Sequence, residues 1–322
     1  MRESKMADPS PLLNVDHLSV WSRRSNKRVP IVEDVTFSVD RGELVAILGE
    51  SGSGKTTLVR ALTRLFRDES AMEVAGNVSF AGTPIHQDAV LSSLRRHKIR
   101  YIFQHPSQAL NPTARIKTQL RNAAADNTEP DLCALLAEVG IQNSNEVLDY
   151  YPHQLSVGMA QRVTIAMAIM PAPDLLIADE PTSALDTSLK IQLLDLLKSI
   201  QSTHGMSMLL VTHSLQVARN YSDRIIVMYA GRIVESSSFK QFFDMPLHPY
   251  SRMMLTAHQS LERQLPHEPI MAGAAERTLA HVGCRFAPRC NLVQQKCWDS
   301  EPHLELLDDH RMIRCFYWKS QS

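Results

Sequence analysis

The chain has 322 residues, of which 44% are hydrophobic and 21% are charged. This length suffices for one large domain with a small appendage or for two ordinary domains, and the composition is that of a globular protein. Its 34 basic and 34 acidic side chains cancel, so no strong positive field would attract a polyanion. We therefore do not expect nucleic acid to be a main partner.

The sequence contains no run that approaches the roughly 18 uninterrupted apolar residues of a membrane-spanning helix. The stretch from Met1 to Pro11 is polar and has no apolar signal core. We expect a flexible N-terminus over residues 1–11 and a protein that stays in the cytoplasm. Any work at a membrane would then require other subunits that span it.

The first elements in chain order are strands. Alternating apolar residues predict strands over Leu12–Val20 and Ile31–Val39, joined as an antiparallel hairpin by the polar loop Ser22–Pro30. A short apolar run over Glu43–Leu48 then meets a glycine-rich loop, which is followed by a helical pattern over Thr57–Phe66. The opening of the chain thus predicts an antiparallel β edge and then a strand, a loop and a helix.

Later segments alternate apolar runs with helical patterns. Strands are expected over Leu175–Ala178, Met208–Thr212 and Ile225–Met228, and a helix over Ser188–Ile200. This alternation predicts an α/β fold with a parallel sheet. Between about residues 89 and 170 helical patterns dominate, which indicates a helical insertion between two sets of core strands.

The end of the chain differs in composition from the rest. A last long helix is expected from the His-Pro-Tyr motif at residues 248–250 to about Glu262, and four cysteines follow it. We place a boundary near residue 260. The chain would then consist of a main domain over residues 12–259 and an extension over residues 260–322.

The glycine-rich loop has the pattern G-x-x-x-x-G-K-[ST] of phosphate-binding loops. Its glycines let backbone N–H groups converge on phosphate oxygens, while Lys55 would reach the β- and γ-phosphates and Thr56 would place its hydroxyl on Mg²⁺. The loop follows a predicted strand and opens a predicted helix, as this mechanism requires. The expected ATP-binding residues of this segment are Gly49, Glu50, Ser51, Gly52, Ser53, Gly54, Lys55, Thr56 and Thr57.

Two acids end the apolar run that begins at Leu175. Because the carboxyl ends of parallel strands meet at one edge of a sheet, these acids would lie beside the phosphates. Asp179 suits Mg²⁺, and Glu180 suits a water that it would orient for in-line attack on the γ-phosphorus. The loop and the acids together predict an enzyme that hydrolyses ATP.

Residues 155–162, which read Leu-Ser-Val-Gly-Met-Ala-Gln-Arg, resemble the signature motif of ABC transporter ATPases. Further elements of that family appear in order along the chain: Gln104 is similar to its Q-loop glutamine, residues 183–186 to its D-loop, and His213 to its switch histidine. The resemblance spans residue 12 to about residue 255. It implies a P-loop, RecA-like ATPase core with an antiparallel β edge and a helical subdomain.

The resemblance also implies a head-to-tail dimer in which each ATP lies between the phosphate loop of one subunit and the signature of the other. Ser156 and Gly158 would contact the γ-phosphate of the partner's ATP at the positive end of the following helix. Gln104 would contact Mg²⁺ and link the site to the membrane partner, and His213 would hold the γ-phosphate during catalysis. The expected catalytic residues are thus Glu180, His213 and Gln104.

The chain departs from the family pattern at two positions. Val157 stands where the family usually has a glycine, and a β-branched residue adds bulk and restricts the backbone there. We therefore expect the site that this signature completes to hydrolyse ATP slowly. In addition, the position that aligns with the family's adenine-stacking aromatic is Ser22, with Trp21 one place earlier. Either a bulge brings Trp21 over the adenine or Trp21 simply packs.

Several motifs resemble the dipeptide, oligopeptide and nickel importers of this family. They are Leu-Asn-Pro at residues 110–112, Tyr-Pro-His-Gln-Leu at residues 151–155 and the motif at residues 248–250. The resemblance implies import of dipeptides, oligopeptides, nickel or a metallophore at the cytoplasmic face of a bacterial inner membrane. The implied partners are a sister ATPase that forms a heterodimer with this chain, two permeases and, indirectly, a periplasmic or extracellular solute-binding protein.

The four cysteines of the extension follow the spacing C-x5-C-x6-C-x17-C, at Cys284, Cys290, Cys297 and Cys315. This spacing lacks the C-x2-C pair of a zinc ribbon. The extension resembles that of dipeptide-type subunits, whose four cysteines bind a [4Fe–4S] cluster. Four thiolates suit either metal, so a cluster, a zinc ion and four unligated cysteines remain open, whereas disulfides are disfavoured in a reducing compartment. Cys133 lies alone in an apolar helical pattern and is expected in the core.

Two other functions compete with the transport motor. One is a soluble ABC-type ATPase that acts on DNA or ribosomes, which the neutral charge balance and the importer-like extension disfavour. The other is a chain that binds ATP and regulates assembly with little turnover, which the valine in the signature would favour. Substitution of Glu180 separates the motor from the regulator, because only a motor depends on that carboxylate.

Overall fold

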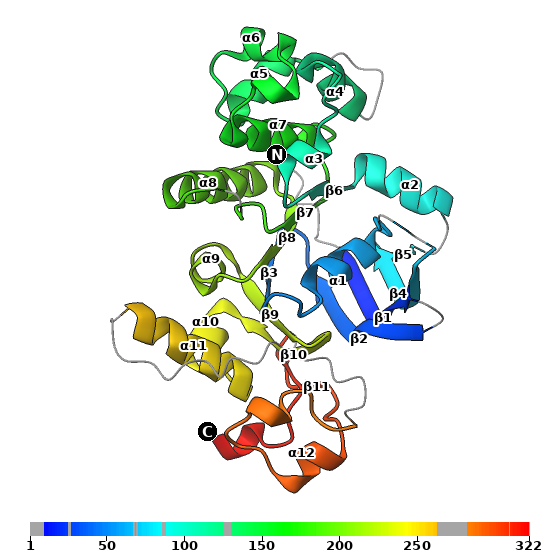
Figure 1. Ribbon diagram of the computed structural model, residues 1–322, viewed down its shortest axis with the longest axis vertical. Coiled ribbons are helices and arrows are strands. Elements are labelled where there is room, and N and C mark those ends of the chain that lie inside the picture. Colours follow the sequence, from blue (N-terminus) through cyan, green and yellow to red (C-terminus); the bar gives the residue numbers. More distant parts are fainter. Residues whose placement is uncertain are drawn as a thin grey trace, which may run out of the picture. The chain divides into compact units, whose positions relative to one another are not determined.

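The structure is a computed structural model, and its description covers residues 10–24, 27–66, 68, 70–85, 88–124, 130–183, 185–262, 282–308 and 310–321. The chain divides into two compact units. The first consists of residues 1–41, 45–86 and 213–322, and the second of residues 42–44 and 87–212. Figure 1 labels the elements of both units.

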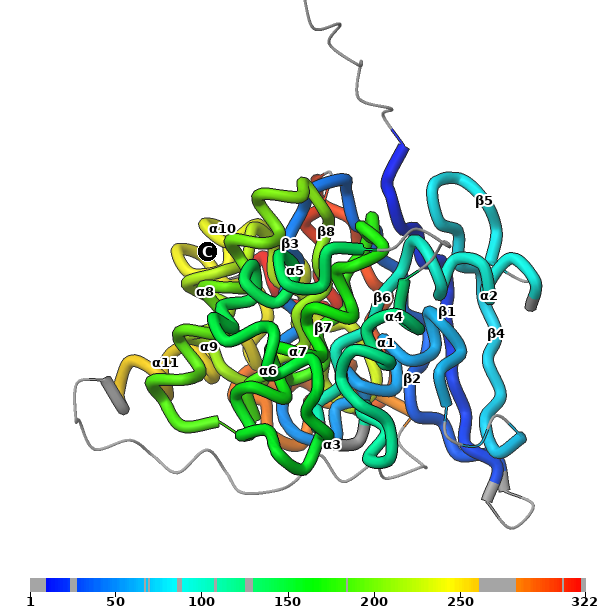
Figure 2. The backbone as a smooth tube through the Cα atoms, turned by 90° about the horizontal axis from the view of Figure 1, so that it is seen from above, coloured from blue at the N-terminus to red at the C-terminus, as the bar shows by residue number. Residues whose placement is uncertain are grey.

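An antiparallel sheet opens the first unit, with strand order β2-β1-β4-β5. Its strands are β1 (Leu13–Arg24), β2 (Lys27–Val39), β4 (Met72–Phe80) and β5 (Thr83–Pro84). The predicted hairpin of β1 and β2 is confirmed, and Figure 2 shows β4 running beside β1. The strands are longer than predicted, because backbone pairing continues through the polar residues as far as Arg24 and Lys27.

A second sheet of the first unit contains strands in the order β11-β12-β10-β9-β3. They are β3 (Leu44–Leu48), β9 (Arg224–Tyr229), β10 (Arg232–Ser238), β11 (Glu305–Leu306) and β12 (Met312–Ile313). Strands β3 and β9 are parallel and buried along their whole length, as continuous apolar runs covered on both faces should be. The pairs β9–β10, β10–β12 and β12–β11 are antiparallel.

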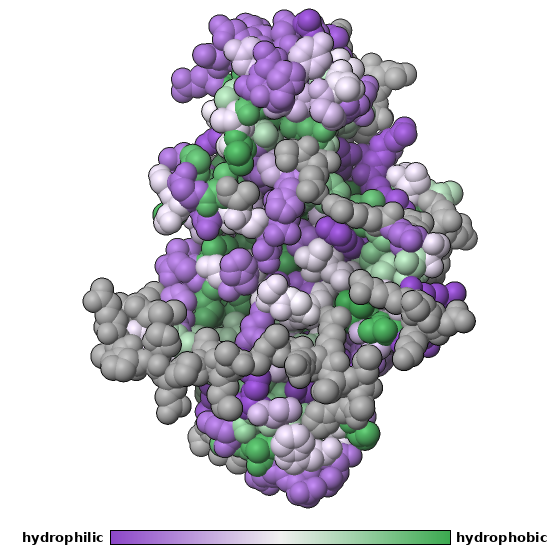
Figure 3. Space-filling view, viewed as in Figure 1, coloured by the Kyte–Doolittle hydropathy of each residue, from purple (hydrophilic) through white to green (hydrophobic). Residues whose placement is uncertain are grey.

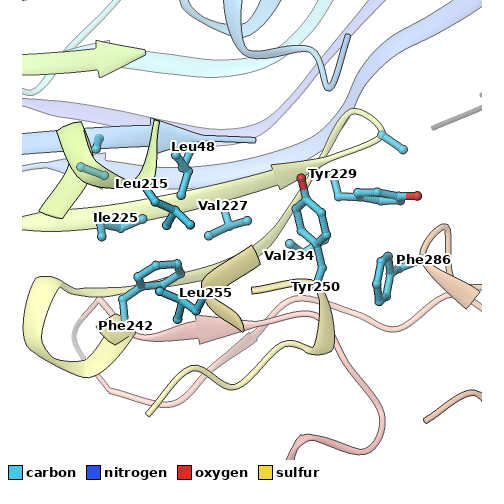
Figure 4. Close-up of a cluster of buried hydrophobic side chains, with 13 residues drawn as sticks. Leu48, Leu215, Ile225, Val227, Tyr229, Val234, Phe242, Tyr250, Leu255 and Phe286 are labelled. Atoms are coloured by element: carbon cyan, nitrogen blue, oxygen red, sulfur yellow. The ribbon is translucent and has the colours of Figure 1, made fainter. Parts of the chain in front are cut away.

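The helices of the first unit are α1 (Lys55–Leu62), α9 (Leu215–Tyr221), α10 (Phe239–Asp244), α11 (Pro249–Glu262), η2 (Ala287–Arg289), α12 (Gln295–Asp299) and η3 (Trp318–Gln321). One apolar cluster joins β3, β9 and β10 to α9, α10 and α11. Figure 4 shows that Phe286 of the extension lies in this cluster, close to Tyr229 and Tyr250. The extension therefore shares a core with the strand that leads into the glycine-rich loop.

The second unit contains the parallel strands β6 (Ile99–Ile102), β7 (Leu175–Asp179) and β8 (Ser207–Thr212) in the order β8-β7-β6. Its helices are α2 (Asp88–His97), α3 (Pro106–Ala109), α4 (Ile116–Ala123), α5 (Leu132–Glu138), α6 (Ser144–Asp149), η1 (Pro152–Gln154), α7 (Val157–Ile169) and α8 (Thr187–His204). Figure 3 shows a mostly hydrophilic surface over α4, α5 and α6.

The predicted α/β fold is confirmed, with parallel strands in both units and an antiparallel sheet at the start of the chain. The proposed boundary near residue 260 falls just before the end of α11 at Glu262, and residues 263–281 lie outside the described residues. That boundary stays a prediction. Among the helices of the described chain, none has both the length and the apolar content that a bilayer crossing requires.

Candidate functional site

The glycine-rich loop of the first unit connects β3 to α1, and two of its glycines are required by geometry. A Cβ atom at Gly49 would collide with the carbonyl oxygen of Met228 and lie 2.8 Å from Ser53 Oγ. Gly54 precedes the first residue of α1 with φ of 102°, in the left-handed region that favours glycine. These two positions fix the path of the loop where it leaves the strand and where it enters the helix.

The interior of the loop has the chemistry of an anion site. The buried Lys55 ammonium donates to the carbonyl oxygens of Gly49 at 2.7 Å and Glu50 at 2.9 Å. The Ser53 carbonyl accepts a hydrogen bond from Gly231 N–H at 2.8 Å, whereas the buried Ser53 hydroxyl has no hydrogen-bond partner among the described residues. Because a buried hydroxyl without a partner costs free energy, this loop fits a ligand that presents oxygen atoms.

Glu50 connects the loop to other parts of the first unit. Its backbone N–H donates to the Tyr250 hydroxyl at 3.2 Å. Its carboxylate accepts two hydrogen bonds from Arg289, at 3.0 Å from Nη1 and 2.9 Å from Nη2. These hydrogen bonds raise the pKa of Arg289 and keep its guanidinium charged. The Glu50 side chain is therefore engaged with the extension.

The two acids of the second unit end strand β7 in different conformations. Asp179 is fully buried, and its Oδ2 accepts a hydrogen bond from the Tyr101 hydroxyl at 2.7 Å. Glu180 has φ of 46°, and its N–H donates to the Val211 carbonyl at 3.0 Å, which anchors this left-handed turn to β8. The backbone thus changes direction sharply between the two carboxylates.

The signature segment begins helix α7. Ser156 caps the helix, with its hydroxyl accepting a hydrogen bond from Met159 N–H at 3.2 Å. Val157 is the first helical residue and its side chain is 55% exposed. This position is helical, so its backbone conformation does not require a glycine. The added bulk of Val157 remains, and it lies on the surface. A Cβ atom added at the neighbouring Gly158 would meet Leu189 Cδ1 at 4.0 Å.

The predicted site residues are divided between the two units. The loop residues, Trp21 and His213 belong to the first unit, and His213 is exposed directly after β8. The members in the second unit are Gln104, Ser156, Gly158, Asp179 and Glu180. Within that unit, Gln104 is half-buried two residues after β6, the strand that also carries Tyr101. Their joint contact with one nucleotide and Mg²⁺ stays a prediction.

Trp21 lies next to an irregularity in the β1–β2 pairing. Val20 pairs with Val32 and Trp21 pairs with Pro30, so Ile31 is an extra residue in β2. A bulge is therefore present at this position, although the extra residue is on the opposite strand. The Arg28 guanidinium lies 3.8 Å from the centre of the Trp21 ring. One face of the ring is thus covered by a cation, and stacking of Trp21 on adenine stays a prediction.

The four cysteines of the extension line one small cavity. Its thiols are Cys284, Cys290, Cys297 and Cys315, and all four are free. The cavity is otherwise lined largely by apolar and aromatic residues, including Phe286 and the buried His248. Burial lowers the pKa of His248 to about 3, so this ring is neutral.

The protonation of these thiols follows from their surroundings. Burial raises the pKa of Cys284 to about 12 and that of Cys315 to about 11, and it also raises the pKa of Cys290. Without a cation these three thiols are therefore protonated, whereas a bound metal would favour the thiolates. Across the described ranges, no set of three or more His, Cys, Asp or Glu side chains is arranged to hold a single metal ion.

Three contacts were not predicted from the sequence. They are the Tyr101 hydroxyl on Asp179, Arg289 on the Glu50 carboxylate and the Tyr250 hydroxyl on Glu50 N–H. The motif at residues 248–250 was a signal for Tyr250, but it did not indicate which group Tyr250 contacts. No local pattern indicated that Tyr101 or Arg289 would make these contacts.

The expected core position of Cys133 is wrong. Its side chain is only partly buried in α5, and its thiol donates to Asn145 Oδ1 at 3.2 Å. The buried positions of this helix are Leu132 and Leu136, so an apolar pattern did not identify which face is covered.

The fold is that of known ATP-binding cassettes. One similar structure is a dimeric cassette in a post-hydrolysis state bound to ADP and Pi, with a TM-score of 0.61 and 25% identity over 70% of this chain and 98% of that one. Another is cbiO1 of the cbiONQ ABC transporter complex from Clostridium perfringens, with a TM-score of 0.62 and 25% identity over 79% of this chain and 97% of that one. Together with the phosphate loop, this fold defines an ABC-type ATPase.

Sequence comparisons give the family more closely. Residues 32–183 match the ABC transporter family, and residues 234–297 match the oligopeptide/dipeptide transporter C-terminal region. The oligopeptide transport ATP-binding protein AppD of Bacillus subtilis is 34% identical over 97% of this chain and 98% of its own length. A putative peptide import ATP-binding protein of Brucella abortus is 36% identical over 95% of both chains. The chain therefore belongs to the family of ATP-binding subunits of oligopeptide/dipeptide-type ABC transporters.

Proposed function

We propose that this chain hydrolyses ATP to drive the import of peptides through a membrane transporter. The observation that carries the proposal is the combination of a complete phosphate loop with a region, residues 234–297, that matches the oligopeptide/dipeptide transporter C-terminal region. The names of the relatives from Bacillus subtilis and Brucella abortus support peptides as the cargo class. Nickel and metallophores are the alternative cargoes in this class of importer.

The chemical roles follow from the residues of both units. Mg²⁺, when bound, would neutralise phosphate charge, and Thr56, Gln104 and Asp179 are the side chains proposed to hold it. Tyr101 restrains the Asp179 carboxylate through its 2.7 Å hydrogen bond and so limits the orientations that this ligand can take. The loop N–H groups and Lys55 bind the phosphates, and thereby position the γ-phosphorus for displacement.

Glu180 is the proposed catalytic carboxylate. A carboxylate within hydrogen-bond reach of a water orients it for attack, and this role is typically worth 10²–10⁴-fold in rate. The left-handed backbone conformation of Glu180 turns the chain directly after the buried Asp179. His213 is proposed to contact the γ-phosphate, and Gln104 to connect the site with the permeases.

The ATP site is proposed to be completed by a second ATPase subunit. Ser156 and the N–H groups at the start of α7 form a positive helix end that suits the γ-phosphate of a partner's ATP. A head-to-tail pair is supported by the cassette that was solved as a dimer with ADP and Pi. We propose a heterodimer with a sister ATPase, docked on two permeases at the cytoplasmic face of the membrane and served by a solute-binding protein.

The exposed valine of the signature makes the two ATP sites of such a heterodimer unequal. Val157 would project its branched side chain toward the partner's nucleotide from a position where a glycine leaves space. The partner's site would then turn over more slowly than the site at this chain's own phosphate loop. A regulatory subunit with little turnover is the extreme form of this proposal.

We further propose that the four-cysteine cavity holds a [4Fe–4S] cluster. Four thiols that line one cavity supply the donor set of such a cluster. Anaerobically purified protein should show an absorption band at about 400 nm together with bound iron. Zinc without iron, or no metal, in protein purified in this way would refute the cluster.

The proposed function is tested with the chain in its native assembly. Tagged chain is purified from its host in mild detergent, and the subunits that accompany it are identified. The proposal predicts two permeases and a second ATPase, and peptide uptake that disappears when the gene for this chain is deleted. Uptake of nickel in place of peptides would change the cargo, and purification without any permease would favour the soluble ATPase.

A further inference from the structure

The turn between Cys284 and Cys290 contacts the phosphate loop through a charged pair. Arg289, one residue before Cys290, donates from both terminal nitrogens to the Glu50 carboxylate at 3.0 and 2.9 Å. The Arg289 side chain is 9% exposed and that of Glu50 is 34% exposed, so the pair is partly shielded from water. A two-pronged pair with a planar guanidinium fixes both distance and orientation, which a lysine would do less well.

A second arginine of the same turn reaches the far end of the loop. Arg285 donates to the carbonyl oxygen of Ala230 and pairs with Glu33. The next residue, Gly231, donates its N–H to the Ser53 carbonyl at 2.8 Å and accepts from Glu33 N–H at 2.9 Å. The turn thus contacts Glu50 directly and is linked to Ser53 indirectly, through Ala230 and Gly231.

Aromatic packing connects the same turn to the backbone of the loop. The Phe286 ring lies 5.2 Å from that of Tyr229 and 5.5 Å from that of Tyr250, centre to centre. Figure 4 shows these three rings together at one end of the apolar cluster. Tyr250 carries the hydroxyl that accepts the N–H of Glu50. A shift of Phe286 would therefore move the group that orients this loop amide.

A thiol lies at each end of this turn. Cys284 and Cys290 bound the turn, and both line the cavity shared with Cys297 and Cys315. The Cys284 N–H also donates to the Cys297 carbonyl at 2.8 Å, so the two segments are joined by backbone as well. A group that ligates the four thiols would hold the turn at both of its ends.

We infer that the extension supports the phosphate loop of its own chain, that Arg289 is a positioning residue for nucleotide binding, and that a ligated thiol cavity strengthens nucleotide binding through this arginine. The first two parts rest on the ATP-binding function alone. The third part also rests on the proposed metal group, and it is tested separately.

The test measures equilibrium binding of MgATP by the full-length chain at a temperature where hydrolysis is negligible. Arg289→Ala should raise the Kd about tenfold, because the loop loses its carboxylate restraint, and Arg289→Lys should recover part of that loss. The matched control is Arg311→Ala, which removes another arginine of the extension that donates to the Met245 carbonyl at 3.0 Å and leaves the loop untouched. Its Kd should equal that of the unaltered chain.

A second readout separates positioning from a general loss of structure. Amide hydrogen exchange should accelerate at residues 49–54 in Arg289→Ala while β7 and β8 of the second unit keep their protection. Glu50→Gln removes the negative charge of the other member of the ion pair and should weaken MgATP binding by a similar factor. If Arg289→Ala fails to fold, Glu50→Gln tests the same pair. Unchanged Kd and unchanged exchange in a folded variant would overturn the inference.

A third experiment tests whether the thiol cavity affects nucleotide binding. It compares Cys290→Ser alone with Cys290→Ser combined with Arg289→Ala, and the iron content of each sample is measured. Cys290→Ser should weaken MgATP binding in the unaltered chain and add little in the Arg289→Ala background. Equal effects in both backgrounds would overturn the coupling through Arg289. Failure of the unaltered chain to bind MgATP at all would instead refute the proposed function, so that the two failures are distinguishable.

Discussion

At the scale of single residues, the phosphate loop is defined by close contacts. The Cβ-free Gly49 sits against the Met228 carbonyl, and the Lys55 ammonium is held by two carbonyl oxygens of the loop. These contacts hold the loop in its observed conformation. They also leave the Ser53 hydroxyl buried without a partner among the described residues, which a bound phosphate would relieve.

Gly49→Ala tests the close contact at the start of the loop. The new methyl group would collide with a backbone carbonyl in a buried strand, so the loop has to shift. We expect MgATP affinity to fall by at least about tenfold, with a small loss of thermal stability. Gly52→Ala is an informative companion, because its Cβ atom would meet nothing within 4 Å, although its φ of 79° strains any side chain. Equal affinity of Gly49→Ala and the unaltered chain would contradict this account.

A titration near the antiparallel sheet gives a prediction with a definite sign. The hydrogen bond between His17 Nδ1 and Asp34 Oδ1, 2.6 Å long, raises the pKa of His17, and the charge of Asp16 acts in the same direction. The pair therefore stabilises the folded state fully below the ordinary histidine pKa of about 6.5. This contribution is lost as the pH rises through the folded-state value.

The measurement is an NMR titration of the His17 ring. The pKa of His17 should lie above the ordinary value in the unaltered chain and return toward it in Asp34→Asn. An identical His17 titration in both proteins would refute the ion pair.

At the scale of elements, strand ends and helix starts supply the functional groups. Strand β7 delivers Asp179 into the interior and then turns at Glu180, while α7 begins with a serine cap and an exposed valine. In each case buried apolar runs fix the element and leave its terminal residues for chemistry. The extension also contributes a side chain, because Arg289 contacts the loop between β3 and α1.

Val157→Gly tests the effect of the signature helix on the partner's site. Removal of the branched side chain should increase ATP turnover of the assembled heterodimer several-fold, because space opens for the partner's nucleotide. The helix start also loses some stability, since glycine is a poor helix former, by about 0.5–1 kcal/mol. The measurement is steady-state ATPase activity of the purified complex. An unchanged turnover rate would contradict the proposal that Val157 makes the two ATP sites unequal.

At the scale of the whole molecule, some features could be predicted from the sequence and others could not. The strands, the phosphate loop and the acid pair were predictable because each depends on residues close in sequence. The Arg289–Glu50 pair joins residues 239 positions apart, and the Tyr101–Asp179 hydrogen bond joins residues 78 apart. Local periodicity holds no information on which side chains meet across such separations, and it also failed to identify the covered face at Cys133.

The central proposal is that this chain is a working ATPase of an importer and that Glu180 is its catalytic carboxylate. The most direct test is ATP turnover of the purified transporter complex with the unaltered chain and with Glu180→Gln. Turnover should fall roughly 10²-fold or more in the variant while MgATP binding persists, because glutamine keeps the shape of the side chain and loses the carboxylate. An unchanged turnover rate would contradict the motor and support a regulatory subunit.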